Sequence, residues 1–501
     1  MYQLYRDRPL LLLTMVLANI ALSAWCLIID PVINNDGVTY LAIAQMMLDG
    51  EWAKSFDYYS WPYYSVFIAA TAKIFFLEVE TAAHLLNAIL ATSLTLAFVC
   101  IVAELSNNNR SIIMIAMLVI LFFPSITKYR SFIIRDFGYL SCYLWSLYFI
   151  FRFCSTLNKS HLIGWLLFAA LSCLFRFEGV AFLLIAPYFL LLFTARRMPH
   201  RRKILSVLSV LIISVSVALV IWYINDKYAS MIEVAREQGK DIHNVIDLFL
   251  ANIKEKLGGA ELTPLRSTSM FAKDVTNVVY ELVRRMAVFY FLFSVYGYIR
   301  GLGFTSNLMK RIWIVYVATN FLMLVGFSLY NNFLVSRYTM ATALTLLILS
   351  PFVINQLLLN FKNTSQVKRV ASIISIGILL LASLEGMGVH TKKKHIKEAG
   401  LWLKSEVGDG ASFYSNDRLM HYYVEEDAAQ NLTHSPNNIE LRAIIDKRQF
   451  RRFDYFALSV NPKSKLEDYF RQTLSYYCGR PIKIFEGTDG RAAYIFKTKK
   501  D

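Results

Sequence analysis

The chain has 501 residues, of which 56% are hydrophobic and only 18% are charged, and its mean hydropathy is +0.43. This balance excludes a soluble multidomain protein and is typical of a polytopic membrane protein. The net charge of +16 raises the question of nucleic-acid binding. The basic residues, however, lie in clusters between apolar runs, which is where topology signals occur, and we therefore expect no nucleic-acid partner.

The first predicted element is an apolar run at residues 9–29, which follows Arg6 and Arg8. It has the general form of a signal peptide, but its apolar core is too long and no small-residue cleavage site follows it. We therefore interpret it as an uncleaved first transmembrane span. Because basic residues favour the cytoplasmic side of a membrane, the N-terminus is expected inside.

Two interfacial helices are predicted next. The stretch NNDGVTYLAIAQMMLDGEW, which begins at Asn34, should form a short helix against the membrane. The run from Pro62 to Leu77 has only about 16 residues and contains Lys73, which is short for a span and suits an aromatic-rich interfacial helix. If this run spanned the membrane, the basic cluster RRMPHRRK at 196–203 would be pushed outside. If it lies flat, every basic cluster falls inside, so we predict that it lies flat.

The remaining apolar runs complete a transmembrane domain at residues 1–388, with about eleven spans. The spans are predicted at residues 9–29, 81–104, 111–128, 137–153, 160–175, 178–195, 203–225, 283–302, 311–330, 338–358 and 369–388. The segments expected to face outward are residues 30–80, 129–136, 226–282 and those after about 389. The loop at 226–282 is long and polar, and loops of such length are more often functional than idle.

Residues 389–501 differ in composition from the rest of the chain, because polar residues and turn signals occur throughout. Four runs are predicted as strands, namely ASFYSN, YFALSV, IKIFEG and RAAYIFK. An amphipathic helix is predicted over KKKHIKEAGLWLKSEV, ending near Gly408, and a second helix should have Pro462 in its first turn and Gly479 at its end. Alternating strands and helices predict a small soluble α/β domain.

Six charged residues lie at the outward ends of predicted spans, where a charge is costly unless it is paired or faces a wet cavity. They are Asp36, Arg135, Asp136, Arg176, Glu178 and Arg337. Structural explanations exist for each of them. Asp36 could cap a helix that begins near Gly37, and Arg135 could form a solvated pair with Asp136. Arg176 could reach the lipid headgroups with Glu178 as its partner, and Arg337 could be an interfacial anchor. Taken together, an acid near three arginines suits an anionic headgroup and a hydroxyl to be activated.

Five segments follow one another in a distinctive order and spacing, namely NDGVTYLAIAQMMLDGEW, WPYYSVFIAATAKIFF, IIRDFGYLSCYLWSLYFIFR, LFRFEGVAFLLIAPYFLL and VSRYTMATALTLLIL. In this order and spacing they resemble the C-type (GT-C) glycosyltransferases, membrane enzymes that use polyprenyl-phosphate sugars. Within that superfamily the chain is similar to the aminoarabinose lipid A transferases and the protein O-mannosyltransferases. The family commonly has a second acid after the first Asp, whereas this chain has Gly37 after Asp36. That departure weakens any role that needs a second carboxylate there, including metal binding.

The resemblance implies that Asp36 is the catalytic base, which is the role of the family's first-loop Asp. It also implies a donor-phosphate site, to which the family contributes a basic residue before the sixth span and a late Arg-Tyr element. The residues assigned to this site are Arg176, Arg337 and Tyr338, with Arg135 as a further arginine. Two more outward acids, Asp136 and Glu178, are candidates whose role stays open.

This chemistry is consistent with the residues themselves. A lipid phosphate is a good leaving group if arginines stabilise the departing charge, and a positioned carboxylate can activate the acceptor hydroxyl. One base and no covalent intermediate imply a single displacement with inversion at the sugar carbon. Five of the six cysteines lie in apolar runs, so there is no Cys/His metal spacing, and the chain has no nucleotide-sugar Asp-x-Asp pair and no Walker motif. No cofactor is assigned, and a divalent metal stays open.

We therefore predict an α-helical polytopic membrane glycosyltransferase of the GT-C type. It would transfer a sugar from a polyprenyl-phosphate donor to a lipid, glycan or protein of the cell envelope, lipopolysaccharide included. The active site and the C-terminal domain would face the periplasm or outside of a bacterial inner membrane. Two alternatives stay open. A transporter or flippase for lipid-linked saccharides would not need Asp36 in one fixed place and would more often show internal repeats, and a polymerase or ligase would transfer a chain instead of one sugar.

Overall fold

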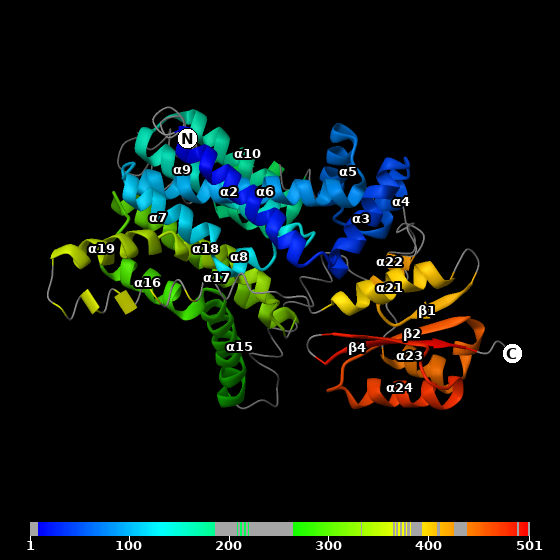
Figure 1. Cartoon of the computed structure of the whole chain (residues 1–501). Helices are drawn as coiled ribbons and strands as arrows, with labels where there is room; N and C mark the ends of the chain where they lie inside the picture. The colour runs from blue at the N-terminus through cyan, green and yellow to red at the C-terminus, as the bar shows by residue number, and fades with distance from the viewer. Residues whose placement is uncertain are drawn as a thin grey trace.

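A computed structural model describes residues 9–185, 264–331, 333–363, 393–407, 411–424, 438–487 and 490–498, together with scattered positions between 208 and 219 and between 366 and 381. It consists of a bundle of apolar helices and a smaller C-terminal unit of strands and helices (Figure 1). Several predictions fall wholly or largely outside the described residues. These are the spans at 203–225 and 369–388, the second half of the span at 178–195, the basic cluster at 196–203 and most of the loop at 226–282.

The helical part contains both long helices and short connecting ones. They are α2 (Pro9–Ile29), α3 (Asn35–Leu48), α4 (Trp52–Tyr58), α5 (Tyr63–Phe75), α6 (Val79–Leu105), α7 (Arg110–Leu121), α8 (Pro124–Thr127), α9 (Asp136–Thr156), α10 (Lys159–Phe175), α15 (Pro264–Arg285), α16 (Ala287–Ile299), α17 (Asn307–Asn331), η1 (Ser336–Thr339), α18 (Met340–Leu347) and α19 (Ser350–Asn363).

Within the described residues, three helices are long and apolar enough to cross a membrane, namely α2, α6 and most of α17. A bent pair formed by α18 with its preceding turn and α19 raises this to four if the pair counts as one span. Large apolar side chains of α2 such as Leu10, Leu17 and Ile28 are more than half exposed, as expected for a surface that faces lipid tails and not water. The chain is therefore a helical integral membrane protein.

Three predicted spans differ from the observed helices, because each is divided into two. The run at 111–128 is α7 and α8, and Pro124 at the start of α8 cannot continue a helix from the preceding turn because it has no N–H. The run at 338–358 bends by 46° between α18 and α19, where Pro351 lacks the N–H that would extend the ladder. The run at 283–302 begins in α15 and continues in α16 after a left-handed residue, Ala287, with φ 49°.

The segment predicted to lie flat forms α5, a helix of 13 residues. A helix of this length covers about 20 Å, against about 30 Å of hydrocarbon in a bilayer, so it is too short to span. In Figure 1 α5 stands upright, whereas α6 runs across the view. Both features favour an interfacial position, and the orientation of α5 in a membrane stays a prediction.

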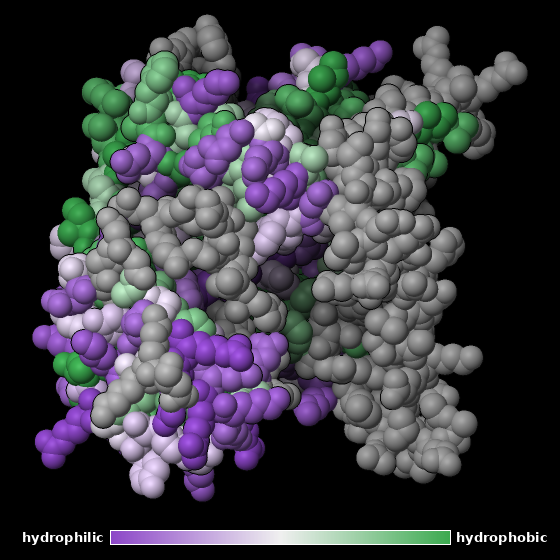
Figure 2. Space-filling model, turned by 90° about the vertical axis from the view of Figure 1, so that its right-hand side faces the viewer, coloured by the Kyte–Doolittle hydropathy of each residue, from purple (hydrophilic) through white to green (hydrophobic). Residues whose placement is uncertain are grey.

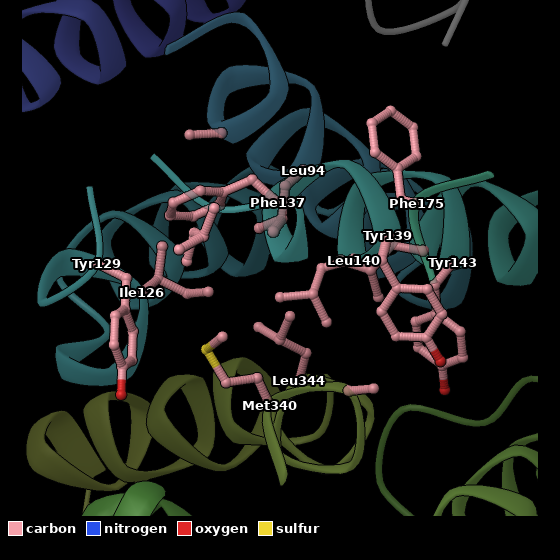
Figure 3. Packing of buried hydrophobic residues seen from close by; sticks show 14 of the residues in the cluster. Leu94, Ile126, Tyr129, Phe137, Tyr139, Leu140, Tyr143, Phe175, Met340 and Leu344 are labelled. Carbon is pink, nitrogen blue, oxygen red and sulfur yellow. The ribbon is translucent and has the colours of Figure 1, made fainter. Parts of the chain in front are cut away.

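Helix α9 lies at the centre of the bundle, where it packs on α6, α10 and α18. It is buried on nearly all sides, which explains why its sequence is apolar and aromatic around the whole helix and not along one stripe. Figure 3 shows Phe137 and Leu140 of α9 facing Met340 and Leu344 of α18. This packing places the first turn of α9, which begins at Asp136, against the turn before α18.

The C-terminal unit, meaning the described residues from Lys393 to Thr498, contains strands at all four predicted positions. Its elements are α21 (Lys394–Val407), β1 (Phe413–Ser415), α22 (Arg418–Val424), α23 (Asn438–Asp446), η2 (Gln449–Arg452), β2 (Tyr455–Val460), α24 (Lys465–Cys478), β3 (Lys483–Glu486) and β4 (Ala492–Lys497). The sheet has the order β1-β2-β4-β3. Strands β1 and β2 are parallel, with Tyr414 opposite Phe456, and the other pairs are antiparallel.

Of two helix boundaries predicted in this unit, one is confirmed and the other is wrong. Gly479 ends α24 with φ 86°, as predicted. Pro462, however, precedes the helix and does not lie in its first turn, because Ser464 is the N-cap and its side chain accepts a hydrogen bond from the Glu467 amide. Figure 2, which views the right-hand side of Figure 1, shows hydrophilic residues over the lower part of the face, where this unit lies, and hydrophobic ones toward the top.

Candidate functional site

Four helix ends that are distant in sequence meet at one end of the bundle. Asp36 lies in the first turn of α3, Asp136 in the first turn of α9, and Arg176 is the C-cap of α10. Arg337 lies in η1, directly before α18. The structure thus brings together charged residues from four separate parts of the chain.

Arg176 forms a buried ion cluster with two carboxylates. Its guanidinium group donates hydrogen bonds to both Asp136 and Glu178. The side chains of Arg176 and Asp136 are each 5% exposed, so neither charge is compensated by water. Ion pairs this deeply buried cost about 3–5 kcal/mol to break by removal of one partner, because the other charge is then left unpaired.

Arg337 forms a second, more accessible ion pair. Its Nη1 atom donates to Oδ2 of Asp36 at 2.6 Å, and the two side chains are 25% and 41% exposed. The Arg337 guanidinium stays positively charged, because arginine is not deprotonated in proteins. Its Nε atom is buried and has no hydrogen-bond partner among the described residues.

Tyr338 lies close to both arginines. The guanidinium carbon of Arg176 is 4.1 Å from the centre of the Tyr338 ring, and that of Arg337 is 6.0 Å away. The ring also makes a T-shaped contact with Phe327 of α17, with the ring centres 4.8 Å apart. The aromatic ring therefore interacts favourably with both cations.

A pocket of about 520 Å³ opens beside these charges. At one end it is lined by Asp136, Arg176, Glu178, Arg337 and Tyr338. The rest of its lining is largely apolar and comes from α9, the segment after α10, and α17, with Leu140, Leu184, Met323, Leu324 and Phe327 among its residues. A mostly apolar cavity with a few charged groups at one end is the common form of a site for an amphipathic ligand.

The charges around the pocket balance. Asp36, Asp136 and Glu178 are matched in number by Arg176, Arg337 and Arg135, the last of which lies over the Tyr59 ring at 5.8 Å. An anionic ligand would therefore find no unpaired arginine in this set. It would have to displace a carboxylate from an arginine, and the exposed Arg337–Asp36 pair is far easier to open than the buried Arg176–Asp136 pair.

Gly37 follows Asp36, and its packing explains why no second acid stands there. A Cβ atom at this position would lie 2.9 Å from both Asn34 Oδ1 and Ile33 Cγ2, and 3.1 Å from Cβ of Ile133. These approaches are closer than ordinary van der Waals contact. The packing around Gly37 by Ile33, Asn34 and Ile133 therefore disfavours a side chain at this position.

The structure tests several of the structural explanations given above for these residues, and excludes some of them. Asp36 does not cap α3, because the N-cap is Asn34. Asp136 is buried and paired with Arg176, and no ion pair joins it to Arg135 in the described part of the chain. The predicted partnership of Arg176 with Glu178 is present, although Arg176 is buried and only Glu178, at 35% exposed, is partly accessible. Within the described residues, neither Arg135 nor Asp36 lines the pocket, and Asp36 is joined to it only through Arg337.

Sequence reasoning missed the pocket residues Tyr139, Asn320, Met323 and Phe327. They lie inside apolar helices α9 and α17, and nothing in their neighbourhood distinguishes them from core residues. Only Asn320 carries a signal, since a polar residue inside a predicted span is a candidate for function. Its amide donates to the hydroxyl of Tyr143 and to the carbonyl of Tyr316. Across the described residues, no group of three or more His, Cys, Asp or Glu side chains is placed to hold a metal ion.

Comparison with known proteins adds little to this picture. No protein-family model and no curated protein sequence matches the chain. Among solved structures, the oligosaccharyltransferase of Archaeoglobus fulgidus, tethered through a disulfide bond to an acceptor peptide with the NVT sequon, aligns with 84% of this chain at 12% identity and a TM-score of 0.41. The alignment spans 59% of that structure. A likeness at this level does not indicate a function for this chain.

We expect Asp136→Asn to destabilise the folded protein by roughly 3 kcal/mol, because it removes one of two carboxylates from the buried Arg176. Glu178→Gln should cost less, since the Glu178 side chain is 35% exposed. Thermal unfolding of both purified variants in detergent, followed by intrinsic fluorescence, makes the comparison. If the Asp136→Asn variant is as stable as the unmodified protein, the Arg176–Asp136 ion pair does not stabilise the meeting of α9 and α10.

Proposed function

We propose that the protein is a membrane glycosyltransferase that moves a sugar from a polyprenyl-phosphate donor to a lipid, glycan or protein of the cell envelope. The observation that carries the proposal is Arg337, which lines a largely apolar pocket and forms an ion pair with Asp36, a residue outside the lining. An isoprenoid phosphate has the complementary form, with an apolar chain and an anionic head. A candidate base and a candidate phosphate ligand thus lie in hydrogen-bond contact.

In this proposal the donor phosphate binds Arg337, and the first isoprene units enter the apolar part of the pocket. Arg337 is the better candidate of the two lining arginines because its pair with Asp36 is partly exposed, and such pairs contribute only about 0–1 kcal/mol. A charge-assisted hydrogen bond to phosphate is worth about 1.5–3 kcal/mol, enough to open it. Arg176 would contribute its positive charge from its buried pair with Asp136, and the Tyr338 ring lies close to both cations.

Opening the Arg337–Asp36 pair would also prepare the base. A carboxylate released from a guanidinium group is free to accept a proton from the acceptor hydroxyl. The acceptor oxygen then forms a bond to the anomeric carbon as the bond from that carbon to the phosphate oxygen breaks. The proton passes to Asp36, and Arg337 stabilises the charge that grows on the departing phosphate. This is one displacement, with inversion at the sugar carbon.

The proposal is tested by mass spectrometry of envelope lipids and glycans from cells with the unmodified protein and with Asp36→Asn. We expect the asparagine variant to insert and fold but to lose the sugar-modified product, because it cannot accept the proton. Asp57→Asn, which changes an exposed acid of α4 in the same outward segment, is the matched control and should retain the product. If Asp36→Asn retains it as well, the base assignment is wrong and a transporter becomes the better hypothesis.

Arg337→Ala should weaken binding of undecaprenyl phosphate by roughly tenfold or more and reduce turnover further, by about 10²-fold, because the lost contact is stronger in the transition state. Arg337→Lys should recover only part of both, since it keeps the charge and loses the planar fork. Binding is measured as the rise in unfolding temperature with added undecaprenyl phosphate. The control is Arg284→Ala, which changes a half-exposed arginine paired with Glu281. Equal behaviour of the two alanine variants would refute a phosphate role for Arg337.

We also propose that the C-terminal unit and the site face outward from the inner membrane of a bacterium. A cysteine introduced at the exposed position 480, in a Cys478→Ser background, should react with an impermeant maleimide in intact cells with a permeable outer membrane. A cysteine at the exposed Arg110, the first residue of α7 at its predicted inner end, should react only after the inner membrane is opened. The reverse pattern would invert the topology and move the site to the cytoplasm.

A further inference from the structure

The segment that leads into Asp36 is held from three directions. Helix α3 begins at Asn35 after the N-cap Asn34, and this N-cap makes no side-chain hydrogen bond within its own helix. The Asn34 side chain instead bonds both the amide and the carbonyl of Ile133, at 2.8 and 3.2 Å. The start of α3 is therefore located by the structure around it and not by a local cap.

The C-terminal unit provides the second tether. The amide of Ile33 donates a hydrogen bond of 2.9 Å to the hydroxyl of Tyr423 in α22. Ile33 and Tyr423 are 1% and 8% exposed, so water cannot replace this bond. The ammonium group of Lys397 in α21 donates to the carbonyl of Pro31 at 2.9 Å and lies 5.2 Å from the centre of the Tyr423 ring.

We propose that Tyr423 is a positioning residue for the reaction, which fixes the backbone three residues before Asp36 and thereby the place of the Asp36 carboxylate. This inference rests on the proposed function, in which Asp36 is the base. Arg337 forms the third tether, because it binds the carboxylate itself. If a donor phosphate binds Arg337 instead, the tethers at Ile33, Pro31 and Asn34 remain, together with a longer hydrogen bond of 3.4 Å from Lys393 to the Asn35 side chain. Tyr423 and Lys397 supply the tethers at Ile33 and Pro31.

The neighbouring tyrosine allows a sharp comparison. Tyr422 also joins the C-terminal unit to the helical bundle, through a hydrogen bond of 2.8 Å to Glu80 of α6. It contacts the bundle outside the segment that leads into Asp36. Loss of its hydroxyl therefore reports on docking of the unit in general, whereas loss of the Tyr423 hydroxyl reports on the segment itself.

The experiment compares Tyr423→Phe, Tyr422→Phe and Tyr469→Phe in the full chain. Tyr469 bonds Asp446 within the C-terminal unit and controls for the loss of a tyrosine hydroxyl. Tyr423→Phe should increase deuterium uptake in the peptide that covers residues 31–36 and leave uptake across β2 and β4 unchanged. It should lower product formation in cells about tenfold or more, because small misplacements of a catalytic group are costly. The undecaprenyl phosphate concentration that half-saturates the thermal shift should not change.

The outcomes separate this inference from the proposed function. Faster exchange at 31–36 with normal product would overturn the positioning role, and so would equal losses of product in the Tyr422 and Tyr423 variants. If Asp36→Asn removes the product and Tyr423→Phe does not, the proposed function stands and this inference fails. If Asp36→Asn retains the product, the proposed function fails, and the exchange result still reports whether Tyr423 tethers the segment. Should Tyr423→Phe not fold, Lys397→Gln, which removes the bond to Pro31, is subject to the same criteria.

Discussion

The buried pairing of Arg176 with Asp136 and Glu178 is the constraint on which the arrangement of the outward helix ends depends. Charges at 5% exposure within an apolar bundle are tolerable only when paired, so the start of α9 and the end of α10 have to meet. The close approach of these helices also requires Gly138, where a Cβ atom would overlap the ring of Phe175. With both helix ends fixed, Tyr338 before α18 lies against Arg176, and the pocket is lined by residues of α9, α17 and the segment after α10.

Sequence reasoning located the charged residues of this site but not their partners. A charge at the end of an apolar run is visible in a sequence because it interrupts the run. The partner of Asp136, however, is Arg176, forty residues away, and not its neighbour Arg135. Which helix ends meet depends on side-chain packing across the bundle, and no local pattern encodes it. The breaks at Pro124 and Pro351 were visible as prolines, but the length of the apolar runs outweighed them in the prediction.

In the C-terminal unit the strands were predicted because each has alternating or continuous apolar residues between turn signals. The short helices α22 and α23, of 7 and 9 residues, were not predicted. Segments of this length carry too few turns for a periodic pattern to be distinguished from a loop. The omission matters, because α22 is the element whose two adjacent tyrosines contact the bundle at Ile33 and Glu80. The sequence therefore predicted a separate unit better than it predicted how that unit is attached.

The equal number of acidic and basic side chains in and beside the pocket affects how strongly anionic lipid headgroups are attracted to it. A membrane surface offers anionic headgroups in great excess over any lipid-linked sugar, and an open cluster of arginines would collect them. Each arginine here already has a carboxylate or an aromatic ring as its neighbour. A headgroup gains little by exchanging places with a carboxylate. Internal neutralisation thus weakens the non-specific attraction between this end of the bundle and the anionic lipids around it.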